Sequence, residues 1–249
     1  MIKFFRKIRY NLMETGKTGK YLKYAIGEIV LVVIGILIAL QINTWNEAKK
    51  TSHLETKILK ELHSNLTLDL EEIQSDVRFM DSITKACTVI KDYLKTHDSP
   101  EPSVFNTFSI LRITPHFDPN MSGYGLLQSK GVEVISNDSL RNQVSLLYER
   151  TYPYYKRYEE ERLRFHALHS EPILLNYFNM YFDESSMYYG SFEISQDDYD
   201  KLKTDAAFTK LLSAIAFENS AVHNRGQRTE RSVISLLQFL EDEIERKAY

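Results

Sequence analysis

The sequence is poor in residues that break helices and in residues that form disulfides. It has 9 glycines, 6 prolines and a single cysteine, Cys87, among 249 residues. Scarce glycine and proline favour long helices over turn-rich β structure. One cysteine excludes an intramolecular disulfide, although it does not decide the redox compartment. A formal charge of -3 gives no whole-chain reason to expect nucleic-acid binding.

Motifs for catalysis and cofactor binding are also missing. The sequence has no G-x-x-x-x-G-K-[ST], no G-x-G-x-x-G after a strand, no H-E-x-x-H and no G-x-S-x-G. His166 and His169 could place two imidazoles on one helix face for a metal, but no third ligand accompanies them. Packed or surface histidines are the simpler interpretation. We therefore predict no catalytic residue, no cofactor and no metal site.

One apolar run stands out against this background, from Ile29 to Leu40. With its flanks it gives about 20 residues, which at about 1.5 Å per residue span about 30 Å, one hydrocarbon core. A soluble core helix would show a polar face, and this run has none. A cleaved signal peptide would need a small-residue site after the run, where Gln41, Ile42 and Asn43 stand instead. We predict an uncleaved signal-anchor helix over residues 24–45.

The flanks of this segment predict its orientation. Lysines and arginines are numerous in residues 1–23, whereas only two lysines return shortly after the segment. The positive-inside rule therefore places the N-terminus in the cytoplasm and residues 46–249 on the other side of the membrane. Tyr24 and Trp45 then fall at the two interfaces, where amphipathic aromatic rings are favoured.

Residues 1–23 begin with a basic amphipathic pattern. Apolar positions recur at helical spacing and basic side chains occupy the remainder, which predicts a short helix on the anionic cytoplasmic leaflet. A basic tail without fixed structure is the alternative. The residues expected to bind the leaflet are Lys3, Phe4, Phe5, Arg6, Lys7 and Arg9.

Glu28 is the only ionisable residue inside the apolar segment and has three interpretations. It could contact a partner helix, serve as a proton or ion ligand, or lie near the interface without a role. Glu28, Gly35, Ala39 and Ile42 share a helical stripe, and Gly35-x-x-x-Ala39 is a pair of small residues that permits close helix approach. We predict that this stripe packs against a partner helix in membrane lipid.

The remainder of the chain predicts an all-α fold, an antiparallel helical bundle that follows the single transmembrane helix. Its long helices are expected at about residues 50–97, 139–182 and 206–247. The first carries a heptad-like apolar seam of the kind found in coiled coils, with Cys87 on it as a small buried hydrophobe. The prolines at 153 and 172 must kink or interrupt the second.

Shorter signals fall between the long helices. A short helix is expected from Tyr124 to Ser129, closed by Gly131. Asn137 or Asp138 is a good N-cap for the helix that follows. Residues 184–202 are expected to form a loop with short strand character.

Tyrosines concentrate between residues 148 and 158 and between residues 177 and 192. Such aromatic residues can bind sugars, peptides or cell-wall fragments, or can pack a bundle core with their hydroxyls at its edge. The best ligand or partner surface in the sequence is Tyr152, Tyr154, Tyr155 and Tyr158. Next to it, the glutamates at 159–161 among Arg157, Arg162 and Arg164 predict a solvated charged face.

Two stretches carry a resemblance to a known family. "KFFRKIRYNLM" followed by "KYLKYAIGEIVLVVIGILIALQINTWNE", within residues 1–47, closely resembles the opening of a large family of uncharacterised single-pass membrane proteins from Bacteroidetes. "GYGLLQSKGVEVISNDSLRNQVSLLYE", residues 123–149, is similar to a second recurrent patch of that family. The resemblance implies a Gram-negative inner-membrane anchor with a periplasmic helical domain, but no activity.

Three function classes remain. The first is a non-enzymatic interaction or accessory protein, which presents a periplasmic helical domain to a larger inner-membrane complex or to itself as a homo-oligomer. The second is a periplasmic ligand sensor that signals through a partner, because the cytoplasmic part is too short for an output domain. The third, an enzyme dependent on a metal at His166 and His169, has the weakest support. None of the three involves nucleic acid.

Overall fold

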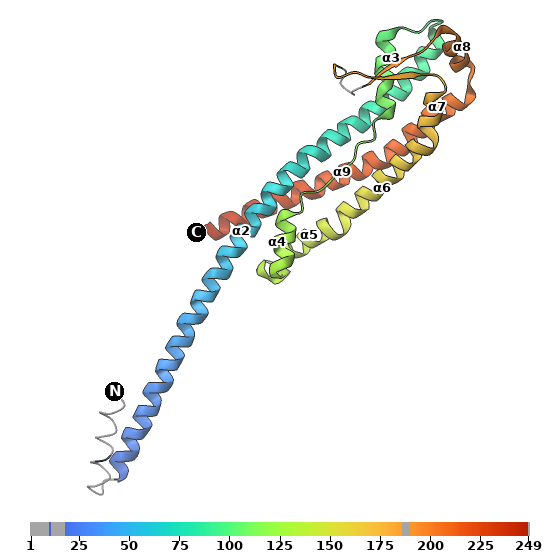
Figure 1. The fold of residues 1–249 in the computed structure, drawn as a ribbon. Helices are drawn as coiled ribbons and strands as arrows, with labels where there is room; N and C mark the ends of the chain where they lie inside the picture. The colour runs from blue at the N-terminus through green and yellow to red at the C-terminus, as the bar shows by residue number, and fades with distance from the viewer. Residues whose placement is uncertain (1–9, 11–17, 186–189, 249) are drawn as a thin grey trace. The chain divides into compact units, whose positions relative to one another are not determined.

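The computed structural model describes residue 10 and residues 18–185 and 190–248. The chain divides into two compact units, Met1–Glu55 and Thr56–Tyr249. Helix α2 (Thr18–Thr96) begins in the first unit and ends in the second (Figure 1). The residues expected to bind the leaflet, Lys3, Phe4, Phe5, Arg6, Lys7 and Arg9, lie outside the described residues.

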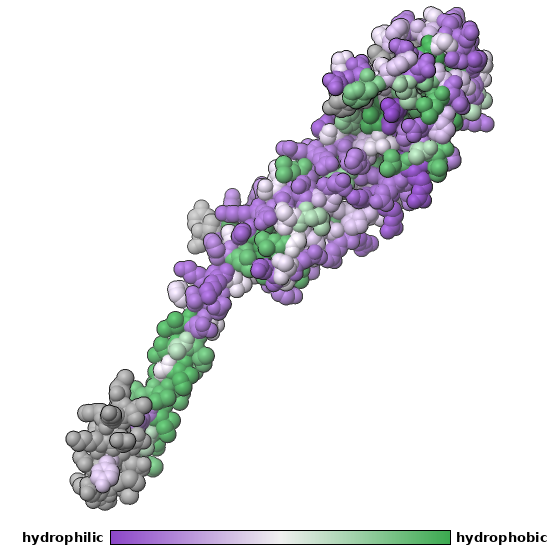
Figure 2. All heavy atoms as spheres, viewed as in Figure 1, coloured by the Kyte–Doolittle hydropathy of each residue, from purple (hydrophilic) through white to green (hydrophobic). Residues whose placement is uncertain are grey.

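The first unit consists, in its described part, mainly of the N-terminal portion of α2. Its most apolar 18-residue window has a mean hydropathy of 2.6, and none of that window is buried within the protein. Figure 2 shows the resulting green band of apolar side chains. Among the described residues, α2 is the one helix long and apolar enough to cross a membrane, a criterion that a signal sequence also meets.

The second unit is predominantly helical, which confirms the all-α prediction at that level. Polar contacts show how α9 (Ala206–Ala248) lies along α2. Asn219 donates its side-chain amide to the Met80 carbonyl, and the Gln74 amide donates to Glu230 over 3.0 Å. Because the α9 partner number rises as the α2 number falls, the two helices run antiparallel. The α2 residues buried within this unit include Ile58, Leu62, Leu66, Ile73, Met80 and Cys87.

A third helical stretch packs against α9 and is interrupted twice. It comprises α5 (Asp138–Leu146), the π turn η3 (Leu147–Thr151), α6 (Tyr152–Phe165), the π turn η4 (His166–Ser170) and α7 (Glu171–Leu175). Pro153 and Pro172 each stand at the second position of the helix that follows a π turn. A proline lacks the N–H that an α-helix needs, so the regular hydrogen bonding changes before it. The predicted interruptions are confirmed.

For residues 176–202 the expected helix is too long, and the expected loop with short strand character is confirmed only in its strand part. The helix ends at Leu175, and β1 (Asn179–Phe182) pairs antiparallel with β2 (Gly190–Glu193). The expected loop also contains α8 (Gln196–Thr204), because Ser195 caps it by accepting the Asp198 N–H. Buried aromatic side chains on β2 and α8 hold these elements against the core.

The connection from α2 to α5 contains short helices and one extended segment. After α3 (Pro102–Phe108) and η1 (Ser109–Arg112), residues 113–121 have no regular structure and are called the strap. Then come α4 (Ser122–Lys130) and η2 (Val132–Val134), with Gly131 at φ 90° between them. The Asn137 side chain accepts the N–H groups of Ser139 and Leu140. The expected short helix and its caps are confirmed.

Buried carboxylates hold the strap. Asp69 on α2 accepts the Asn120 N–H over 2.9 Å, and Glu159 on α6 accepts the Phe117 N–H over 3.0 Å. An extended segment without a sheet partner needs such acceptors for its backbone. Burial raises the pKa of Glu159 to about 7, and burial likewise raises that of Asp76 to about 7. The prediction of a solvated face is therefore wrong for Glu159.

Candidate anion-binding groove

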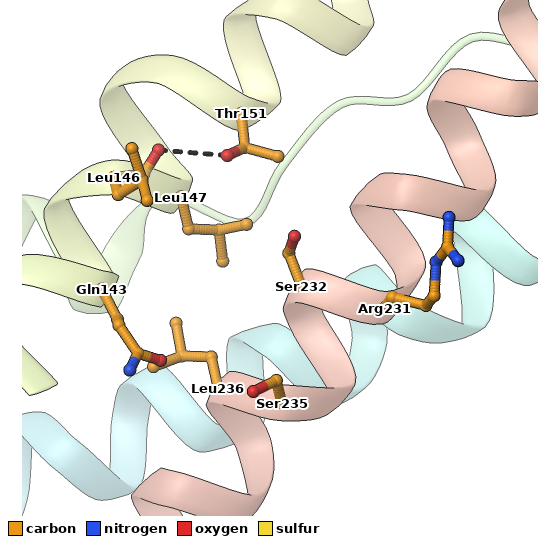
Figure 3. A pocket seen from close by; sticks show the side chains of 8 residues that line it. All are labelled: Gln143, Leu146, Leu147, Thr151, Arg231, Ser232, Ser235 and Leu236. Carbon is orange, nitrogen blue, oxygen red and sulfur yellow. Dashed lines mark hydrogen bonds between the residues drawn. The ribbon is translucent and has the colours of Figure 1, made fainter.

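A groove lies between the α5–α6 junction and α9. It consists of two adjoining cavities, of about 380 Å³ and about 290 Å³, which share Leu146 and Thr151. In the larger one, Leu147 on the η3 turn and Ser232 and Leu236 on α9 point into the same space (Figure 3). The walls of the groove therefore come from segments roughly 80 residues apart in sequence.

The local backbone explains why the groove is open here. The π turn η3 is one residue wider than an α turn, and the Thr151 hydroxyl donates to the Leu146 carbonyl five residues earlier, over 3.2 Å (Figure 3). On α9, Gly226 lets this helix approach α2 closely, because a Cβ there would stand 2.9 Å from Val77 Cγ2 on α2. Helix α9 is thus held against α2 at the level of the smaller cavity, whose lining includes Arg225 and Arg228.

All the charged side chains that line the groove are positive. Four lining residues are arginines, and none is aspartate or glutamate. Arg150 lies on η3, while Arg225, Arg228 and Arg231 follow each other at intervals of three on α9. Across residues 18–185 and 190–248, none of these four guanidinium groups forms an ion pair. These four guanidinium groups therefore have no carboxylate partner at ion-pair distance in the described part of the chain.

Two tyrosines border the groove and hold one of its arginines. The Arg225 guanidinium lies 4.8 Å from the Tyr154 ring centroid and 4.9 Å from that of Tyr158. The two hydroxyls are 3.4 Å apart, and the hydrogen bond with Tyr154, together with Arg225, lowers the pKa of Tyr158. Stacking on the rings orients Arg225, which leaves Arg228 and Arg231 as the exposed charges of that wall.

Of the four tyrosines predicted to form a partner or ligand surface, two are accessible and two are buried. Tyr154 is 41% exposed, and Tyr158 lies beside it. Tyr152 and Tyr155 are 2% and 1% exposed, so they belong to the core rather than to a surface. Positions 154 and 158 are one helical turn apart on the outer side of α6, whereas 152 and 155 point inward. The Tyr152 hydroxyl donates to Asp69 over 2.9 Å.

The groove is suited to a partner that is both acidic and partly apolar. The planar guanidinium fork matches the geometry of carboxylate and phosphate groups. Leu147 and Leu236 form a buried apolar floor, and Leu146 is exposed at the rim.

The sequence predicted the tyrosines but not the arginines, because the alignment of the arginines along the groove depends on how α9 packs. The spacing of three in Arg225, Arg228 and Arg231 was the available signal.

The other predicted sites are not assembled into a centre. His166 is buried and His169 is exposed, and the described residues contain no group of three or more His, Cys, Asp or Glu that could hold a metal. In the first unit, a Cβ on Gly35 would meet no atom within 4 Å.

The other residues predicted to contact the membrane or a partner helix lie on the same helix, α2. Ala39 and Ile42 are exposed on it, and Glu28 is half-buried. Trp45 is exposed with the Lys49 ammonium 5.6 Å from its ring centroid, and the backbone of Tyr24 belongs to the helix while its side chain lies outside the described part. Packing of the Glu28 stripe against a partner helix therefore stays a prediction.

The sequence matches a known family model. A sequence model described as "Family of unknown function (DUF6090)" matches residues 28–170, more than half of the chain. The match includes the apolar segment, the strap and the α5–α6 wall of the groove, whereas the α9 wall lies beyond it. No curated protein and no solved structure matches the chain.

Proposed function

Because the chain belongs to this family of unknown function, its role has to be inferred from its own residues, and we propose that it is a membrane-anchored, non-enzymatic interaction protein. Its helical unit, Thr56–Tyr249, binds an acidic segment of a partner protein in the groove between the α5–α6 junction and α9. The single observation that carries this proposal is the presence of four lining arginines and no lining carboxylate.

The anchor is supported by the energetics of the apolar segment. Exposure of an 18-residue apolar window to water opposes the hydrophobic effect, and transfer into a bilayer removes that cost. The excess of basic residues before the segment supports a cytoplasmic N-terminus, with the helical unit in the periplasm and the protein in the bacterial inner membrane. The stripe of Glu28, Gly35, Ala39 and Ile42 is the surface for helix pairing, in a homo-oligomer or in a larger membrane complex.

The choice of an acidic protein segment follows from the lining. Arginine binds carboxylates bidentately, and charge-assisted hydrogen bonds are about twice as strong as neutral ones. The leucines at the floor and rim favour a ligand with apolar side chains between its acidic ones. An enzyme would instead need convergent nucleophiles, bases or metal ligands, and the groove presents arginines, tyrosines, serines and threonines.

A pair of labelled peptides tests the groove. The full chain in mild detergent is titrated, with fluorescence anisotropy as the readout, against a peptide of alternating glutamate and leucine and against its lysine–leucine counterpart. We expect binding of the acidic peptide that weakens with salt. The double variant Arg228→Gln/Arg231→Gln should weaken it at least tenfold, since each charged hydrogen bond contributes about 1.5–3 kcal/mol.

The matched control is Arg78→Gln/Arg164→Gln, which removes the same charge from two exposed arginines outside the groove lining. This control should bind the acidic peptide nearly as well as the wild type. Equal binding of both peptides, or equal weakening by both double variants, would show that net charge rather than the groove governs association. Either result would refute the proposal.

A further inference from the structure

The arginines that line the groove are gathered toward one of its ends. The smaller cavity is lined by Arg150 on η3 and by Arg225 and Arg228 on α9, so positive side chains come from both walls. Among the described residues, the larger cavity has one charged lining residue, Arg231 on α9. The part of the groove beside the smaller cavity is therefore called the basic end.

The larger cavity is mostly uncharged, because Arg231 lies at its edge. The Arg231 Nε donates to the Gln227 carbonyl over 3.2 Å, four residues earlier on α9 and next to Arg228. Figure 3 shows the Arg231 guanidinium directed away from Leu147 and Leu236. This part of the groove is called the neutral end. The other polar side chains that line it are uncharged, namely Gln143, Thr151, Ser232 and Ser235.

The three guanidinium groups at the basic end repel one another in the free protein. Arg150 and Arg228 are exposed on opposite walls of the smaller cavity, and Arg225 stacks on the ring of Tyr154, which also lines it. None of these arginines forms an ion pair in the described part of the chain. Carboxylates held close together would relieve this repulsion from both walls and accept charge-assisted hydrogen bonds.

The length of the groove limits how much of a partner fits in it. Its lining runs from Gln143 to Tyr154 on the α5–α6 wall and from Arg225 to Leu236 on α9. At about 1.5 Å per residue of helix, each wall is about 16 Å long. An extended chain advances about 3.3 Å per residue, so about five residues span this distance. Such a segment is long enough to place acidic residues at one end and uncharged residues at the other.

We infer that the partner segment carries its carboxylates as a cluster at one end and uncharged residues at the other, an inference that rests on the proposed function. Two or three consecutive acidic residues contact Arg150, Arg225 and Arg228 at the basic end. Apolar and hydroxyl-bearing side chains follow them over Leu147 and Leu236 at the neutral end. Arg150 determines this specificity, because it supplies the positive charge on the second wall.

Two peptides of identical composition, length and net charge test the inference. The clustered peptide has three consecutive glutamates followed by leucine, serine and leucine, and the dispersed peptide alternates the same glutamates with the same uncharged residues. Both are blocked at their ends, labelled, and titrated against the full chain in mild detergent by fluorescence anisotropy. The clustered peptide should bind about tenfold more tightly, because it forms additional charge-assisted hydrogen bonds at the basic end.

Single variants assign the preference to a residue. Arg150→Gln should bring the two affinities to within about twofold of each other, because only one charged wall remains. Arg78→Gln removes the same charge from an exposed position outside the groove lining and should keep the preference. A preference that is unchanged in Arg150→Gln would overturn the role of Arg150.

The failure of the inference is distinguishable from the failure of the proposed function. Equal affinities of the wild type for the two peptides, with binding weakened in Arg228→Gln/Arg231→Gln, would overturn the clustered arrangement and leave the groove as the binding site. Absence of binding by both peptides would refute the proposed function itself, and the inference with it.

Discussion

Helix α2 contains two apolar regions that use their side chains differently. In residues 29–40 every position is apolar, and no other part of the described protein buries these side chains, as at Leu37, which is 58% exposed. In residues 58–94 apolar residues recur every three or four positions among polar ones, and most of this seam is buried, as at Leu66, which is 0% exposed. A helix that is apolar on all sides needs an apolar environment outside the protein. A helix with an apolar seam instead buries that seam against neighbouring helices.

The largest expected effect comes from truncation of the seam. Leu66→Ala should lower the free energy of unfolding by about 2–5 kcal/mol, because it leaves a cavity in a packed core. Leu37→Ala removes the same atoms from the other region and should leave that free energy almost unchanged. Unfolding of the full chain in detergent, followed by circular dichroism, measures both. Equal losses in the two variants would mean that the protein itself buries residues 29–40.

The second test introduces a charged side chain into each of the two regions. Leu37 and Leu68 have similar exposed fractions, 58% and 52%, on the same helix. Leu37→Arg should impair membrane integration, because an arginine at the centre of a bilayer helix costs about 2.5–3.5 kcal/mol. Leu68→Arg should remain in the membrane fraction like the wild type, because water already surrounds that position. Fractionation with alkaline extraction measures the outcome, and full retention of Leu37→Arg together with release of Leu68→Arg would reverse the comparison.

The smallest expected effect concerns two buried carboxyl groups, Asp76 on the second region of α2 and Glu159 on α6, which packs near it. Asp76 and Glu159 have pKa values raised by burial from 3.8 and 4.5 to about 7. The folded state therefore holds protons that the unfolded chain has released, so these groups lower the free energy of unfolding as pH rises from about 4 to about 7. Asp76→Asn should flatten this slope and raise the Tm at pH 8 by about 2–4 °C, equivalent to about 1 kcal/mol.

The control for this titration is Glu71→Gln, which changes an exposed carboxylate on the same helix. Its Tm should follow the wild type at pH 5 and at pH 8. Asp76 is preferable to Glu159 as the altered residue, because Asp76 Oδ2 has no hydrogen-bond partner in the described structure while Glu159 holds the strap. An Asp76→Asn slope identical to that of the wild type would assign the pH dependence to other groups.

Periodicity predicted the parts of the fold that local rules determine. The long helices, the turn at Gly131, the Asn137 cap and the interruptions before Pro153 and Pro172 all follow from residue type and spacing. Helix α8 was missed although Ser195 and Asp198 form a recognisable capping pair. The signal was present, but the polar composition of that stretch favoured a loop.

The sequence did not reveal which charged residues are buried. Within "EEERLR" the rule that charged residues stay in water holds for Glu160 and Glu161, but Glu159 and Arg162 turn inward. They are three positions apart, so they share a face of α6 that packs against α2 and the strap. Which charges lie on that face depends on contacts between distant segments. For the same reason the groove arginines could not be assigned before the packing of α9 was known.

The antiparallel packing of α9 on α2 has a consequence for synthesis. His63 contacts Glu241 over 3.1 Å, Gln74 contacts Glu230, and Asn219 contacts Met80. Each of these contacts joins residues that the ribosome adds at widely separated times. The seam of α2 leaves the ribosome long before its cover exists. During translation these leucines and isoleucines therefore lack their partner helix until α9 has been synthesised.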